Sequence, residues 1–138
     1  MGTRSLIGRE NVDGSIDAVY CHWDGYLSHN GRILLDHYDM AKLDRLIRLG
    51  DLSSLGEEIG EKHDFDKRPE GVCTFYNRDR DEALADTKAR RYMNRREMQK
   101  HREEFSYIMD QFGVWHVAVL DREFVPLRQA LLEKDSEE

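Results

Sequence analysis

Residues 105–120 read FSYIMDQFGVWHVAVL, and this stretch decides the fold. Two runs rich in aromatic and β-branched residues, 105–110 and 114–120, flank the short connection Gln-Phe-Gly. Residues of these types favour strands, and a glycine between two such runs favours a tight turn. The stretch therefore predicts a β-hairpin in the C-terminal part of the chain.

A second hairpin is predicted near the N-terminus. Residues 4–9 and 15–23 have the composition of strands, and Asp13-Gly14 between them tolerates the positive φ of a turn. Side chains alternate between the two faces of a strand. In the second strand both faces are largely apolar toward the C-terminal end, so we expect this strand to lie in the middle of the sheet.

Capping residues predict helices after the first hairpin. Ser28 is expected to cap a helix that ends near Tyr38, and Asp39 to cap a second helix that ends at Gly50. Residues 51–56, Asp-Leu-Ser-Ser-Leu-Gly, repeat the order of capping residue and terminal glycine over a single turn.

The rest of the chain contains four further segments. Residues 57–70 are polar and predict a loop, and residues 71–76 predict a third strand. Residues 81–103 favour a helix by propensity, although their apolar stripe is thin. A last short helix is predicted over 124–133, with Pro126 in its first turn.

Together these elements predict a single α+β domain. Their order is β-β-α-α-β-α-β-β-α, which favours a mostly antiparallel sheet of about five strands with helices packed on it. We expect the domain to cover residues 1–132 and the acidic residues 133–138 to form a flexible tail.

Composition sets the expected environment. The 138 residues carry a net charge of −7, and 36% of them are charged. The two cysteines, Cys21 and Cys73, are too few for a disulfide framework, so both are expected to be reduced. We find no apolar run near the ~20 residues of a membrane span and no apolar core of a signal peptide. A cytoplasmic protein with no membrane partner is expected.

Residues 20–26, YCHWDGY, hold the densest group of side chains able to bind a ligand. Their aromatic rings suit stacking on a planar ligand, and the imidazole and carboxylate suit hydrogen bonds to it. Free N–H groups of the helix that follows would favour a phosphate. In the alternative interpretation the aromatic residues are packed in the core and Asp-Gly is only a turn. The candidate ligand-binding residues are His22, Trp23, Asp24, Tyr26 and His29.

Residues 88–102 form a basic stretch with seven Lys and Arg residues and one acid, Glu97. Tyr92 and His101 lie between the basic residues, a pattern that suits RNA phosphates or a stacked base. Alternatively, the stretch is a solvated helix that pairs with the acidic remainder of the same molecule. The candidate ligand-binding residues of this stretch are Arg90, Arg91 and Arg95.

Catalytic chemistry is the less favoured hypothesis. The sequence contains no phosphate loop, no dinucleotide-binding glycine pattern and no nucleophile elbow, and we expect neither a cofactor nor a metal site. Cys21 and His22 are neighbours on a strand and point to opposite faces, so they cannot form a dyad directly. The enzymatic alternative is a small metal-dependent hydrolase or nuclease that uses His22, Asp24 and His63.

Three motifs carry a resemblance to a known group of proteins. They are Thr3-Arg4-Ser5-x-Ile7-Gly8, the stretch from Val19 to Tyr26, and Gly50-Asp-Leu-Ser-Ser-Leu-Gly56. In these motifs the chain resembles a family of small proteins of tailed bacteriophages and prophages. The resemblance implies a setting, the cytoplasm of a bacterial host, and it implies no particular activity.

In that setting we expect a non-enzymatic accessory protein that acts by binding and blunts a bacterial defence. Its partner would be either a host protein or a small phosphorylated ligand such as a nucleotide signal. An RNA-binding module through residues 88–102 is a further alternative, disfavoured by the net negative charge. Exposed strand edges in a small domain also favour a homodimer.

Overall fold

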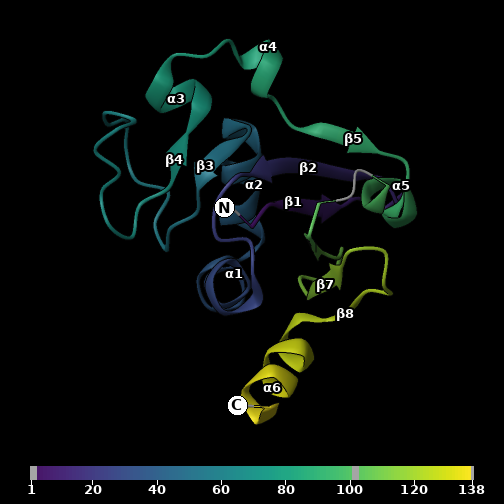
Figure 1. Cartoon of the computed structure of the whole chain (residues 1–138). Coiled ribbons are helices and arrows are strands. Elements are labelled where there is room, and N and C mark those ends of the chain that lie inside the picture. Colours follow the sequence, from purple (N-terminus) through teal and green to yellow (C-terminus); the bar gives the residue numbers. More distant parts are fainter. Residues whose placement is uncertain (1–2, 101–102, 138) are drawn as a thin grey trace.

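The computed structural model describes residues 3–100 and 103–137, which form a mixed eight-stranded sheet with helices packed against it (Figure 1). In chain order its elements are β1 (Ser5–Glu10), β2 (Ile16–Cys21), the single π-helical turn η1 (Leu27–Gly31), α1 (Arg32–His37), α2 (Met40–Leu49), β3 (Leu52–Ser54), β4 (Thr74–Phe75), α3 (Tyr76–Arg80), α4 (Leu84–Thr87), β5 (Arg90–Tyr92), α5 (Arg95–Gln99), β6 (Phe105–Met109), β7 (Trp115–Val119), β8 (Val125–Pro126) and α6 (Leu127–Glu137). The α+β class is therefore as predicted.

Both predicted hairpins are confirmed, as β1–β2 and β6–β7. The sheet order is β4-β3-β2-β1-β6-β7-β8, and β5 pairs with β2 outside this path. Two of the pairings are parallel, β1 with β6 and β2 with β3. The sheet is mostly antiparallel, as expected, but it has eight strands where about five were predicted.

The helical turn predicted over residues 51–56 is wrong, because Leu52–Ser54 form β3 beside β2. Asp51 explains the extended conformation. Its carboxylate accepts a hydrogen bond from the backbone N–H of Tyr20 (2.9 Å), and its own N–H donates to the carbonyl of Thr87 (2.7 Å). These bonds hold the segment alongside β2, where its backbone groups pair with a strand instead of closing a helical turn.

The single helix predicted over residues 81–103 is also wrong. The segment divides into α4, β5 and α5, and residues 101–102 lie outside the described part of the chain. Pairing of β5 with β2 buries Tyr92, which a lone polar helix could not achieve. Asn94 then starts α5, since its side chain accepts a hydrogen bond from the N–H of Glu97 (2.9 Å).

Helix caps are predicted correctly in one of two cases. Asp39 caps α2 by accepting from the N–H of Lys42 (2.8 Å), and Gly50 ends this helix at φ +87°. Ser28 is not a cap, because helical structure already begins at Leu27, where η1 leads into α1. The helical segment does end at Tyr38, as expected.

The remaining segments follow the prediction in part. The loop over residues 57–70 is confirmed, but the third strand is reduced to β4, and Tyr76 already belongs to α3. The last helix begins at Leu127, directly after β8, and continues to Glu137 through most of the expected acidic tail. Glu138 lies outside the described residues.

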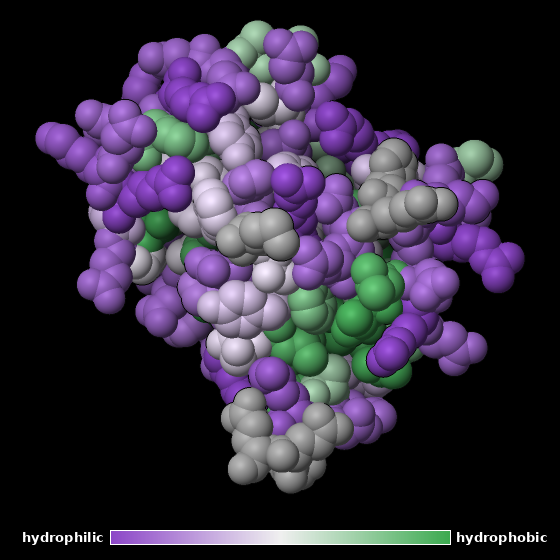
Figure 2. All heavy atoms as spheres, in the orientation of Figure 1, coloured by the Kyte–Doolittle hydropathy of each residue, from purple (hydrophilic) through white to green (hydrophobic). Residues whose placement is uncertain are grey.

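Both faces of the sheet are buried, as the alternation in β2 predicts. Val19 and Cys21 face the larger core, which is closed by α1, α2 and α6. Ile16 and Ala18 face a smaller core, which Met98 of α5 helps to cover. In Figure 2, apolar residues gather on the surface over β7 and β8, whereas polar residues dominate over α3, α4 and β5. Within the described residues, no helix has the length and apolar character that a membrane span requires.

Tyr107 of β6 links the two hairpins through a buried hydrogen bond. Its side chain is fully buried, and its hydroxyl donates to the carbonyl of Gly25 (2.6 Å). Burial raises the pKa of Tyr107 far above its usual range, so the phenol stays a donor. This bond fixes the chain just beyond β2, next to the cluster at residues 20–26.

We expect Tyr107→Phe to lower the free energy of unfolding by about 1–3 kcal/mol, because it leaves the Gly25 carbonyl buried without its donor. Urea denaturation followed by circular dichroism measures this change. The matched control is Tyr26→Phe, which removes a phenol that is 40% exposed and should leave stability nearly unchanged. Equal effects of the two substitutions would contradict a stabilising role for the bond.

Candidate functional site

Residues 20–26 continue from β2 into a tight bend. The N–H groups of His22 and Trp23 donate to the carbonyls of Leu52 (3.1 Å) and Ser53 (3.0 Å), so pairing with β3 extends to Trp23. The bend follows at Asp24, whose φ is +57°. Asp-Gly therefore breaks the strand at the expected position.

One part of this cluster is core, as the packing interpretation proposed. Cys21 is fully buried, and burial raises the pKa of its thiol to about 12, which leaves it unsuited to nucleophilic attack. The buried amide of Asn30 donates to the Cys21 sulfur (3.4 Å), the hydroxyl of Ser5 (3.3 Å) and the carbonyl of Trp23 (3.4 Å). This amide joins β1, β2 and η1 beneath the bend.

His22 and Trp23 remain partly exposed above this core. Their rings meet edge to face, with centroids 4.7 Å apart. The Tyr20 hydroxyl lies 2.7 Å from Nδ1 of His22, and burial raises the pKa of Tyr20 to about 12, so the phenol is the donor of this bond. Burial and the nearby guanidinium groups of Arg4 and Arg68 lower the pKa of His22, which favours the neutral imidazole.

Arg4 and Arg68 are the site residues that the sequence reasoning missed. Arg4 directly precedes β1, where the pairing of Ser5 with Cys21 sets it beside His22. Arg68 comes from the 57–70 loop and lies over the ring of Phe65, 5.2 Å from its centroid. Both arginines are exposed, and neither forms an ion pair with an acid in the part of the chain that the structure describes. We call Arg4, Tyr20, His22, Trp23 and Arg68 the arginine–aromatic face.

Tyr26 and His29 form a separate pair beyond the bend. Their ring centroids are 6.0 Å apart, and Nδ1 of His29 lies 2.9 Å from the side-chain oxygen of Asn30. Two of the N–H groups expected to be free at the helix start have partners, because those of His29 and Asn30 donate to the carbonyls of Tyr26 (3.1 Å) and Asp24 (3.2 Å). These amides are not free to bind an anion.

Two arginines of the basic stretch pair with acids of the same molecule. Arg91 donates to Asp17 (2.8 Å) and lowers the pKa of that carboxyl, and Arg95 donates to Glu10 (2.7 Å). Arg91 and Arg95 therefore belong to intramolecular ion pairs, as the alternative interpretation stated. Arg90 is exposed, and its register opposite Ala18 puts it on the face of the sheet that carries Tyr20.

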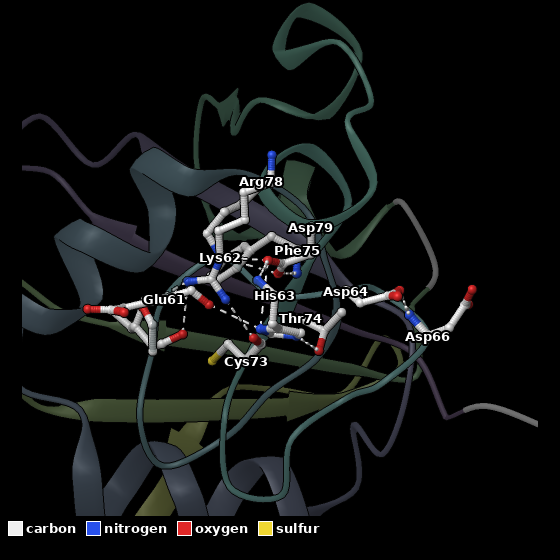
Figure 3. Close-up of polar contacts among 12 residues, drawn as sticks. Glu61, Lys62, His63, Asp64, Asp66, Cys73, Thr74, Phe75, Arg78 and Asp79 are labelled. Carbon is white, nitrogen blue, oxygen red and sulfur yellow. Dashed lines mark hydrogen bonds and ion pairs between the residues drawn. The ribbon is translucent and has the colours of Figure 1, made fainter.

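A buried ion pair fixes the loop that supplies Arg68 (Figure 3). Asp79 is fully buried and accepts from Arg78 Nε (3.0 Å) and from the backbone N–H groups of His63 (3.0 Å) and Phe75 (2.8 Å). Nε2 of His63 lies 3.0 Å from the Thr74 hydroxyl. His63 thus helps to fix the 57–70 loop, because its backbone binds Asp79 and its ring binds Thr74.

The described residues do not form the set of metal ligands that the enzymatic alternative requires. Among the side chains that the structure describes, in residues 3–100 and 103–134, no three His, Cys, Asp or Glu come together in a group that could hold a metal ion. His22 is engaged with Tyr20, and His63 with Thr74 and Asp79. Comparison of the chain with family models, curated proteins and solved structures finds no match. The candidate site therefore rests on its geometry.

We expect Asp79→Asn to lower the free energy of unfolding by about 3 kcal/mol, because it leaves the Arg78 charge buried without its partner. Urea denaturation at neutral pH measures this loss. Asp81→Asn is the matched control, since the Asp81 side chain is 84% exposed and its ion pair with Lys62 lies at the surface.

The buried ion pair of Asp79 with Arg78 also makes the stability of the protein depend on pH. Burial acts to raise the pKa of Asp79, but the hydrogen bonds from Arg78, Phe75 and His63 outweigh it and hold the pKa below its ordinary value of 3.8. The contribution of Asp79 is therefore complete above pH 3.8 and is lost as the pH falls toward the lower folded-state pKa. Acid titration of stability should be shallower in Asp79→Asn than in the native chain; an identical slope would contradict this assignment.

Proposed function

We propose that the protein acts by binding, and that its arginine–aromatic face holds a small phosphorylated ligand with a planar ring, such as a nucleotide. The observation that carries the proposal is the position of Arg4 and Arg68. Two exposed guanidinium groups lie beside the neutral imidazole of His22, and no acid pairs with either within the described residues. Other exposed arginines of the described chain also lack an ion pair, so what distinguishes Arg4 and Arg68 is their position beside the aromatic rings.

The chemistry of the face suits each part of this ligand. Guanidinium groups bind phosphate oxygens in a bidentate fashion. The ring of Trp23 and the imidazole of His22 offer partly exposed surfaces for stacking and for a neutral hydrogen bond. Arg90 lies on the same side of the sheet and can extend the positive field toward a second phosphate. The proposed ligand contacts leave out five of the residues predicted from the sequence. Two of them are already in ion pairs, Arg91 and Arg95, and three lie at or beyond the bend, Asp24, Tyr26 and His29.

The setting implied by the phage and prophage resemblance gives this binding a purpose. A protein that holds a nucleotide signal in the host cytoplasm would withdraw it from a bacterial defence. Catalysis is not part of the proposal, because Cys21 is buried and the proposed set of His22, Asp24 and His63 does not meet as a metal-binding group among the described residues.

A host protein is the second candidate partner. One observation favours it: apolar residues collect over β7 and β8 (Figure 2), beside a hollow of about 660 Å³ that is lined by apolar residues such as Val119 and Val125 and rimmed by charged ones such as Arg122. Exposed apolar surface of this kind often marks protein interaction sites. Native mass spectrometry of the protein purified from bacterial lysate separates the two candidates. Added mass of a few hundred daltons indicates a retained nucleotide-like ligand, and a co-purifying protein indicates the second candidate.

For the nucleotide hypothesis, we expect Arg4→Gln/Arg68→Gln to weaken the binding of adenosine 5′-monophosphate at least tenfold, since a hydrogen bond to a charged group contributes about 1.5–3 kcal/mol. Calorimetric titration measures the dissociation constant. The control is Arg122→Gln/Arg128→Gln, which removes the same charge from exposed positions. Absence of binding to the native chain, or equal weakening in the control, would contradict the assignment of this face.

A further inference from the structure

A second basic surface lies in a small hollow between α2, the start of the 57–70 loop and α3. The hollow has a volume of about 320 Å³ and is lined by Arg45, Arg48, Leu49, Ile59, Gly60 and Arg78. Three of these residues are arginines, and the lining contains no acid. Neither the sequence motifs nor the arginine–aromatic face accounts for this arrangement.

The three arginines differ in how they are held. Arg45 and Arg48 are exposed on α2, three residues apart and thus on the same side of the helix, and neither forms an ion pair with an acid in the described chain. Arg78 is fixed, because its Nη1 donates to the carbonyls of Ile59 and Gly60 (3.0 Å each) and its Nη2 to that of Cys73 (2.8 Å). Asp79 compensates the charge of Arg78, so the uncompensated charge in the hollow is that of Arg45 and Arg48.

The floor of the hollow is apolar. Ile59 is 3% exposed and Leu49 is half-buried, and the carbonyls of Ile59 and Gly60 are already bound by Arg78, so they do not compete for the hydrogen bonds of Arg45 and Arg48. An arginine in the last turn of a helix also interacts favourably with the helix carbonyls. The position of Arg48 in the last turn of α2 fits this effect, whereas Arg45 lies almost one turn earlier.

We propose that this hollow binds a single phosphate-sized oxyanion, with Arg45 and Arg48 as its ligands and Arg78 as a rigid wall that offers its remaining Nη2–H. The volume of about 320 Å³ is at the lower end of small-molecule sites, which suits one phosphate group and little more. The anion is either inorganic phosphate or the phosphate of a monoester, which share this chemistry. The proposal is independent of any ligand on the arginine–aromatic face.

The test is a titration of the full-length chain with inorganic phosphate, followed by ¹⁵N NMR at constant ionic strength. We expect saturable shifts at the amides of Leu49 and Gly60, and a dissociation constant raised at least about tenfold in Arg45→Gln/Arg48→Gln. The matched control, Arg122→Gln/Arg128→Gln, removes the same charge from other exposed positions and should retain native affinity. Circular dichroism verifies that both variants are folded.

Residue-resolved shifts also separate this site from the arginine–aromatic face, whose own amides include those of Arg4 and His22. Phenyl phosphate in a parallel titration distinguishes the two sources of the anion. Tighter binding than inorganic phosphate indicates a monoester that uses the apolar floor, and equal binding indicates the free ion. The proposal is overturned if phosphate causes no saturable shift at Leu49 and Gly60, or if the control variant loses affinity as much as Arg45→Gln/Arg48→Gln.

Discussion

The parallel pairing of β1 with β6 is the constraint on which the structure depends. It joins Ser5 to Phe105 and continues through Arg9 and Met109, so segments about a hundred residues apart become neighbours in the middle of the sheet. An isolated two-stranded hairpin is marginally stable in water. Joined through β1 and β6, the two hairpins present a continuous surface on each side, on which the two cores are built.

Close packing within the first hairpin supports that pairing. A Cβ atom at Gly8 would lie 2.7 Å from Cγ2 of Ile16, so glycine is needed where β1 passes the larger side chains of β2. Beyond β2, Tyr107 and Asn30 tie the bend at residues 24–25 to β6 and β1. Buried hydrogen bonds of the core therefore fix the backbone next to the arginine–aromatic face.

Part of the fold could be predicted from local sequence signals. Both hairpins follow from alternation and turn glycines, and α2 from the carboxylate of Asp39, because each signal lies within a few residues of its effect. The strands β3 and β5 carry no such signal. They comprise three residues each and owe their extended form to distant partners, such as the bond between Asp51 and Tyr20, which no propensity contains.

The candidate site also has a part that the sequence predicts and a part that it does not. The sequence predicted that His22 and Trp23 follow a central strand. It could not predict the roles of the arginines, because these depend on contacts between residues far apart in the sequence. Arg91 and Arg95 pair with acids 74 and 85 residues away, whereas Arg68 reaches the site on a loop anchored by Asp79. Charge density along the sequence does not report which guanidinium groups are already neutralised, as those of Arg91 and Arg95 are.

The ends of the sheet have a consequence for self-association. Its path terminates in β4 and β8, each only two residues long, and β8 contains Pro126, which has no N–H to donate. The outer edge of β2 is occupied by β3 and β5. β5, which pairs with β2 alone, leaves one further edge of three residues. The described sheet thus offers only short ladders to an incoming strand, which limits edge-to-edge aggregation. Short edges of this kind favour self-association through side chains over strand pairing.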